Sequence, residues 1–121
     1  MKQKKETGGF KKNFSFQFNG KKMRVPVIVC NTFFSQAKGL MFSRGFNALL
    51  FTFDHKTNKS IHSFFCPDFI VIYFDGDRII DLKSITKLSF SIRPLASYTH
   101  FLEIPVGNSA YHLILDGMRK I

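Results

Sequence analysis

Two side chains of metal-binding type, His62 and Cys66, stand four residues apart in the sequence. In an extended strand four residues span roughly 13 Å, which is too far for both side chains to reach one ion. Tetrahedral zinc needs four converging ligands, and His55, His100 and His112 each stand alone in the sequence. The pattern therefore favours structural or surface histidines over a metal site, and we predict no cofactor.

The segment from Arg44 to Phe51 partly matches the RNA-recognition-motif signature, in which a basic residue and a glycine precede spaced aromatic residues. In that motif the ring at the fifth position stacks on a base, but this position is Ala48 here. Ile28, on the strand expected upstream, also lacks a ring. Both positions lack the ring on which a base would stack, and this argues against RNA binding of this type.

Asp68 and Glu103 are the carboxylates nearest to apolar segments. An unpaired charge among apolar strands is costly, so we expect Arg44 to pair with one of them. His62 stands among aromatic residues, where a polar side chain must be hydrogen-bonded or paired. The candidate ligand-binding residues are therefore Arg44, His62, Asp68 and Glu103, and a purely structural network of the same residues is the alternative.

Most of the net charge of +10 lies near the N-terminus. Residues 1–24 hold eight basic side chains against Glu6, a balance of +7 that leaves +3 for the other 97 residues. Such a segment either binds nucleic acid through counterion release or is a solvated end that aids solubility. The basic side chains are Lys2, Lys4, Lys5, Lys11, Lys12, Lys21, Lys22 and Arg24.

The elements that must position these residues begin with a β-hairpin. Residues 14–18 alternate at period two, Asn19-Gly20 is a strong hairpin signal, and residues 23–29 form the returning strand. Pro26 has no N–H to donate, so the second strand should have an unpaired edge there. We therefore divide the chain into a basic, disordered tail at residues 1–13 and one β-rich domain at residues 14–121.

A short helix capped by Asn31 or Thr32 is expected next, because four apolar residues share one of its faces, namely Phe33, Ala37, Leu40 and Met41. Further strands are expected at residues 48–53, 61–65, 69–74, 78–82, 99–104 and 118–121. A polar turn is expected at residues 54–59, and a helical turn from Asn108 or Ser109 to Leu115. The continuous apolar run at 69–74 suits a strand buried on both faces. The predicted fold class is mainly β, a small antiparallel β sandwich or barrel with one or two short helices.

The size and composition of the chain fit one domain with its own core. It has 121 residues, 45% of them hydrophobic, with 16 Phe and no Trp, and most of these rings should pack inside. With only Cys30 and Cys66, a reducing compartment and buried thiols are expected. No run approaches the roughly 18 apolar residues of a membrane helix, so we predict a cytoplasmic protein without membrane contact.

Several strings, taken together, resemble the widespread prokaryotic family called domain of unknown function 192, in the short form typical of archaeal members. The strings are Gly39–Arg44, Ala48–Phe53, Ser60–Phe65, Tyr73–Asp75 and Leu102–Pro105, with Tyr98 and Gly107 between and after them. The similarity runs from about Val25 to Ile121. It implies a compact, mainly β fold with little helix and no established activity. Many members have Pro-Leu-Asp just before the central strand, whereas this chain has Cys66-Pro67-Asp68.

No glycine-rich phosphate loop, nucleophile elbow or zinc-protease motif is present, so the sequence leans away from an enzyme. The leading hypothesis is a non-catalytic module whose pocket or edge, lined by Arg44 and His62, holds a small anion or a protein partner. The second is nucleic-acid binding through the basic tail. The third is a hydrolase or lyase that uses His62 as general base.

Overall fold

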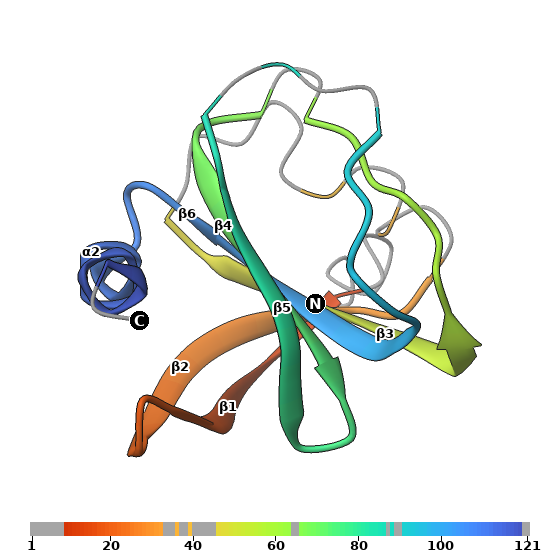
Figure 1. The fold of residues 1–121 in the computed structure, drawn as a ribbon, viewed down its shortest axis with the longest axis horizontal. Coiled ribbons are helices and arrows are strands. Elements are labelled where there is room, and N and C mark those ends of the chain that lie inside the picture. The colour runs from red at the N-terminus through yellow and green to blue at the C-terminus, as the bar shows by residue number, and fades with distance from the viewer. Residues whose placement is uncertain are drawn as a thin grey trace.

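The computed structural model describes residues 9–32, 36, 39, 46–63, 66–86, 88 and 91–119. In these residues six strands form one sheet in the order β1-β2-β3-β6-β4-β5 (Figure 1). The strands are β1 (Gly9–Phe18), β2 (Lys21–Cys30), β3 (Ala48–Thr57), β4 (Phe69–Asp75), β5 (Arg78–Ile85) and β6 (Tyr98–Pro105). Neighbours run antiparallel except β2 and β3, which are parallel. The predicted mainly β class is confirmed, in the form of a mixed sheet.

The predicted N-terminal hairpin is present and longer than expected. Asn19 and Gly20 have φ angles of 52° and 77°, the left-handed conformation that a two-residue hairpin turn needs. Pro26 lies opposite Asn13, and pairing of β2 with β3 begins at Val27, so the missing N–H falls just before that ladder. β1 begins at Gly9, because residues 9–13 continue the ladder with β2. Assigning residues 9–13 to a disordered tail was therefore wrong, and residues 1–8 lie outside the described part.

β4 is the central strand that the apolar run predicted, buried along residues 69–74. Its alternate side chains enter two different cores. Ile70, Ile72 and Phe74 belong to the helix-side core, which also takes residues from β1, β2, β3 and β6. Phe69, Val71 and Tyr73 belong to the loop-side core, which includes Ile92 and is bordered by Ile61 and Cys66. Burial on both faces explains why the run does not alternate between apolar and polar residues.

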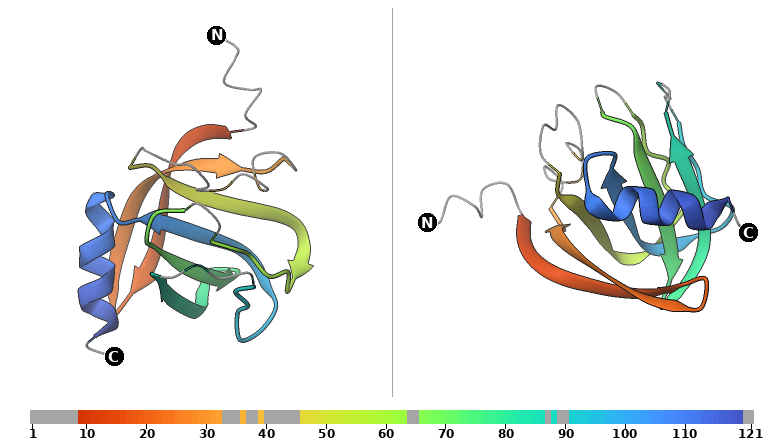
Figure 2. Two further views of the ribbon diagram at one scale, coloured as in Figure 1. Left: turned by 90° about the horizontal axis from the view of Figure 1, so that it is seen from above. Right: turned by 90° about the vertical axis from the view of Figure 1, so that its left-hand side faces the viewer.

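The helix α2 (Ser109–Met118) covers one side of the sheet (Figure 2). Asn108 caps it, since its side-chain oxygen accepts a hydrogen bond of 2.9 Å from the N–H of Ala110. Ala110, Tyr111 and Ile114 lie in the helix-side core. The predicted helical turn was therefore right but too short. No helix in the described residues is long and apolar enough to cross a membrane.

Three other sequence expectations were wrong. β3 continues to Thr57, where its backbone still pairs with Tyr98, so residues 54–59 are not a simple polar turn. Ile61 forms only an isolated bridge with Ile92, so the described part of the predicted strand 61–65 is not an extended ladder. Met118 ends α2 instead of beginning a strand. Its side chain packs against the helix-side core, which favours continued helix over a turn at residues 116–117.

The helix expected after Asn31 lies largely outside the described residues, including Phe33, Ala37, Leu40 and Met41. At its start, the N–H of Gln36 donates to the Thr32 oxygen over 3.0 Å. The Gln36 amide also donates to the Cys30 oxygen at 3.1 Å and to the Thr52 oxygen at 2.7 Å. This side chain therefore joins β2 to β3 where their parallel pairing ends.

The sheet curls so that its two end strands, β1 and β5, approach each other without forming a ladder (Figures 1 and 2). The result is a partly closed barrel around the helix-side core. The open edge of β1 consequently faces the turn between β4 and β5.

Candidate ligand-binding groove

Glu103, one of the four predicted site residues, is buried on β6 between Leu49 of β3 and Val71 of β4. Burial raises the pKa of its carboxyl to about 8, so the group is mostly protonated near neutral pH. It lies beside the backbone of Gly39, because a Cβ added there would be 3.5 Å from its Oε1. Glu103 is thus a neutral polar group inside the loop-side half of the domain.

Two further polar groups lie near Glu103. Burial, followed by the charge of Glu103, raises the pKa of the Cys66 thiol to about 11, so little thiolate forms at neutral pH. The Tyr73 hydroxyl is buried without a hydrogen-bond partner in the described structure, and burial also raises its pKa. Neither cysteine forms a disulfide. These groups give the loop-side core no activated nucleophile.

Of the other predicted residues, Asp68 and His62 belong to the described part of the chain. Asp68 is exposed and borders a small hollow of about 180 Å³ with Ser63 and Cys66 in its wall. His62 is half-buried and does not line this hollow. Arg44 lies outside the described residues, and its predicted pairing with Asp68 or Glu103 lies there too. The structure thus brings Asp68 and Cys66 together at one hollow.

A larger groove of about 380 Å³ lies at the open edge of β1. Phe14 and Phe16 point into the helix side of the sheet, and the intervening Ser15 and Gln17 point away from it. Because all four line the groove, it runs along the strand edge itself. The full lining is Phe14, Ser15, Phe16, Gln17, Lys22, Phe74, Gly76, Asp77 and His100.

Aromatic rings form the inner wall of the groove. The imidazole of His100 stacks on Phe74, with ring centroids 4.8 Å apart and planes at 6°. Phe14 meets both rings edge-on, at 5.3 Å from Phe74 and 5.6 Å from His100. Phe16 packs edge-on against Phe74 at 5.5 Å. Rings held by one another in this way form a rigid apolar surface.

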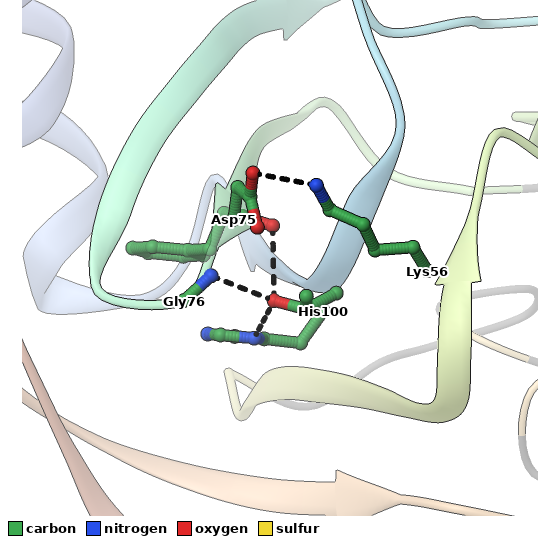
Figure 3. Close-up of polar contacts among 6 residues, drawn as sticks. Lys56, Asp75, Gly76 and His100 are labelled. Atoms are coloured by element: carbon green, nitrogen blue, oxygen red, sulfur yellow. Dashed lines mark hydrogen bonds and ion pairs between the residues drawn. The ribbon is translucent and has the colours of Figure 1, made fainter.

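His100 is oriented by Thr99 (Figure 3). The Thr99 hydroxyl accepts from the N–H of Gly76 at 3.0 Å and donates to the Phe74 oxygen at 3.2 Å. It also lies 2.8 Å from Nδ1 of His100. Because its one hydrogen goes to a carbonyl that can only accept, we assign the hydrogen of this third bond to Nδ1 of His100. Nε2 is then left as an acceptor, and the described residues give it no partner.

The charges around the groove are unequal. Burial, followed by the charge of Lys12, lowers the pKa of His100, so the ring is neutral at neutral pH. Lys22 and Asp77 stand in the lining. The nearby Asp75 is already paired with Lys56 at 2.9 Å (Figure 3). The groove therefore combines an apolar wall, one neutral acceptor and the charged pair of Lys22 and Asp77, and Lys12 adds a positive charge beside His100.

Sequence reasoning missed this site. His100 stood alone in the sequence and was set aside, and Phe14 and Phe74 are 60 positions apart. Only the approach of β1 to the β4–β5 turn brings them together. The alternation of Phe14 and Phe16 was visible, but it predicted only core packing.

Two other observations bear on what the domain could bind. A second hollow of about 340 Å³ lies at the far end of β3, lined mainly by polar residues of the range 52–59. Within the described residues, no group of three or more His, Cys, Asp or Glu side chains could hold a metal ion. The aromatic groove is the better candidate, since ligand sites are mostly apolar with a few convergent polar groups.

Two solved structures share the fold. A protein of unknown function from Novosphingobium aromaticivorans matches with a TM-score of 0.70 and 16% identity, over 80% of this chain and 74% of that chain. A proposed transcription regulator from Sinorhizobium meliloti matches with a TM-score of 0.69 and 14% identity, over 80% of this chain and 81% of that chain. No family model and no curated protein matches the sequence. At these identities the likeness shows the fold alone.

Proposed function

We propose that this chain is a non-catalytic domain that binds a small organic ligand in the groove between β1 and the β4–β5 turn. The observation that carries the proposal is the groove's lining, in which three Phe rings and a neutral imidazole face a rim with charged residues. Its volume of about 380 Å³ falls within the range of roughly 300–1,000 Å³ typical of small-ligand sites.

The hydrogen bonds of Thr99 support binding over catalysis. Thr99 and His100 resemble a nucleophile and a base, since Oγ1 lies 2.8 Å from Nδ1. However, Oγ1 accepts from Gly76 and from Nδ1, and it donates to Phe74, so both lone pairs and the hydrogen are in use. A hydroxyl held in this way orients the imidazole and has no lone pair left for attack.

The test is a nuclear magnetic resonance titration of the full chain with indole. We expect shift changes clustered at Ser15, Gln17, Gly76 and His100. Phe14→Ala should weaken binding about tenfold, because Phe14 forms one wall of the groove. Phe14→Leu, which keeps apolar bulk, serves if the alanine variant unfolds. Phe10→Ala is the matched control, since Phe10 lies on the same strand, is 54% exposed and does not line the groove.

Two results would overturn the proposal. One is the absence of any shift change at millimolar indole. The other is a set of shift changes confined to residues 52–59, which line the polar hollow at the end of β3.

Nucleic-acid binding is a second candidate because of one specific arrangement. Lys11, Lys22 and Arg24 are all exposed, and the hairpin register places them on one face. Replacing all three with Ser should reduce both DNA affinity and its salt dependence. Removal of residues 1–13 is a poor test, because β1 begins at Gly9 and would be cut. Equal binding by the triple variant would exclude this surface.

We also propose membership in the domain of unknown function 192 family, on the strings described above. Supporting it, Gly39 of the first string lies beside Glu103 of the last one. If the proposal is right, established members should show the same contact between the equivalent glycine and a buried glutamate on the equivalent strand. Members without that contact would count against it.

A further inference from the structure

The hydrogen-bonding state of His100 restricts which ligands the groove accepts. In the Thr99 network, Nδ1 carries the ring hydrogen and Nε2 is an acceptor. Within the described structure Nε2 has no partner, yet it is not among the buried, unpartnered polar atoms, of which the Tyr73 hydroxyl is the only one. Nε2 is therefore open to solvent from the groove that His100 lines.

A ligand that covers Nε2 without donating to it would leave this acceptor buried and unpaired. An unpaired acceptor weakens binding. A ligand N–H or O–H at the same place instead replaces the hydrogen bond that Nε2 makes with water. Phe74 stacks on His100 and Phe14 meets both rings edge-on, so the three rings form one apolar surface that favours a flat partner.

The charged residues around His100 determine which sign of charge the groove favours in a ligand. Lys12 of β1 acts on the imidazole and Lys22 of β2 lines the groove, while Asp77 of the β4–β5 turn is the acidic residue in the lining. Asp75, the last residue of β4, is paired with Lys56. Lys22 and Asp77 balance each other in the lining, so Lys12, which lies outside the lining but acts on His100, makes the local charge positive and favours an anionic substituent.

Resting on the proposed function, we infer that the groove takes a planar aromatic anion whose ring N–H or O–H donates to Nε2 of His100. The aromatic part lies against Phe14 and Phe74, and the anionic group lies toward Lys22. Donor, ring and anion together define the ligand class.

The experiment compares three probes on the full chain by calorimetry and by nuclear magnetic resonance. Indole-3-carboxylate has all three features, 1-methylindole-3-carboxylate lacks the donor, and indole lacks the anion. We expect indole-3-carboxylate to bind about tenfold more tightly than its methylated form. We expect Lys22→Ala to remove most of its advantage over indole.

Variants of His100 separate the donor effect from packing. His100→Phe keeps a stacking ring and should bind both carboxylates with equal affinity. His100→Gln places an amide oxygen near the position of Nε2 and should restore part of the preference. His112→Phe is the matched control, because His112 is an exposed residue of α2 outside the groove lining, and it should keep the full preference.

The outcomes distinguish this inference from the proposed function. If no probe shifts the groove residues, the binding function itself fails and the inference fails with it. If all probes bind in the groove but methylation has no effect, or His100→Phe keeps the preference, the binding function stands and the inference is wrong. A preference for indole over the carboxylates would overturn the anionic part.

Discussion

The imidazole of His100 lies flat on the ring of Phe74, with centroids 4.8 Å apart and an angle of 6° between planes. His100 also faces Phe74 across the β4–β6 ladder, so the stacking is fixed by the register of two central strands. A groove wall built this way is as rigid as the sheet, which reduces the ordering that a ligand must impose on binding.

The protonation state of His100 can be measured directly. Burial, then Lys12, lowers its pKa, so the ring should titrate below the ordinary value of about 6.5. Long-range proton–nitrogen spectra at neutral pH should show hydrogen on Nδ1 and none on Nε2. Thr99→Val, which removes the orienting hydroxyl, should abolish this tautomer preference. Hydrogen on Nε2 in the unsubstituted chain would contradict the hydrogen-bond assignment.

Protonation of His100 should also affect stability. Its folded-state pKa lies below the unfolded value, so the unfolded chain binds the proton more readily. Stability should therefore fall as pH drops from about 6.5 toward the folded-state pKa. His100→Phe should show a smaller loss over this range in urea unfolding. Identical pH profiles for the two proteins would show that His100 does not contribute.

The buried carboxyl of Glu103 should make stability change with pH in the opposite direction, in a higher pH range. Its pKa is about 8 in the folded chain and 4.5 when unfolded, so only the folded state keeps the proton between these values. Stability should fall as pH rises through this window and level off above it. Glu103→Gln cannot titrate and should become more stable than the unsubstituted chain as pH rises, by on the order of a few kcal/mol. Parallel curves from pH 5 to pH 8 would rule out a buried neutral carboxyl.

Cys66 should react slowly with iodoacetamide in the folded chain. Its thiol pKa is raised to about 11 from 9.0, which lowers the thiolate fraction roughly hundredfold at pH 8. Peptide mass spectrometry can compare its alkylation rate with that in the urea-unfolded chain. A Cys30→Ala variant serves as control, since it leaves Cys66 as the one cysteine and the removal of Cys30 should not change the rate at Cys66. Equal folded and unfolded rates would contradict the prediction.

Gly117 allows α2 to approach the β1–β2 hairpin. A Cβ at this position would overlap the ring of Phe18, which is buried. Alanine favours helix by up to about 1 kcal/mol, but overpacking costs about 1–3 kcal/mol, so Gly117→Ala should lower the free energy of unfolding. Adding Phe18→Leu should recover part of the loss by making room. An increase in stability for the single variant would mean that the ring moves freely.

Local patterns in the sequence predicted much of the fold. The Asn19-Gly20 turn and the apolar run at 69–74 were each sufficient to define an element, because turn geometry and two-sided burial leave clear patterns. The extension of β3 to Thr57 was not predictable, since its polar end is held by pairing with β6. Strand pairing between distant segments leaves no local pattern.

The candidate site was predicted less well for the same reason. Glu103 was correctly singled out as a polar group among apolar strands, and the structure places it inside the domain. His100 was not singled out, because its significance depends on Thr99, Gly76 and the approach of β1. Those contacts arise only when the sheet curls.

The most direct test of the central claim is the set of intermolecular nuclear Overhauser effects between indole-3-carboxylate and the full chain. A ligand in the groove should give effects to the ring protons of Phe14, Phe74 and His100. Phe10 on the same strand should give none, because it does not line the groove. Effects that reach only Phe53, in the polar hollow at the end of β3, would contradict the account.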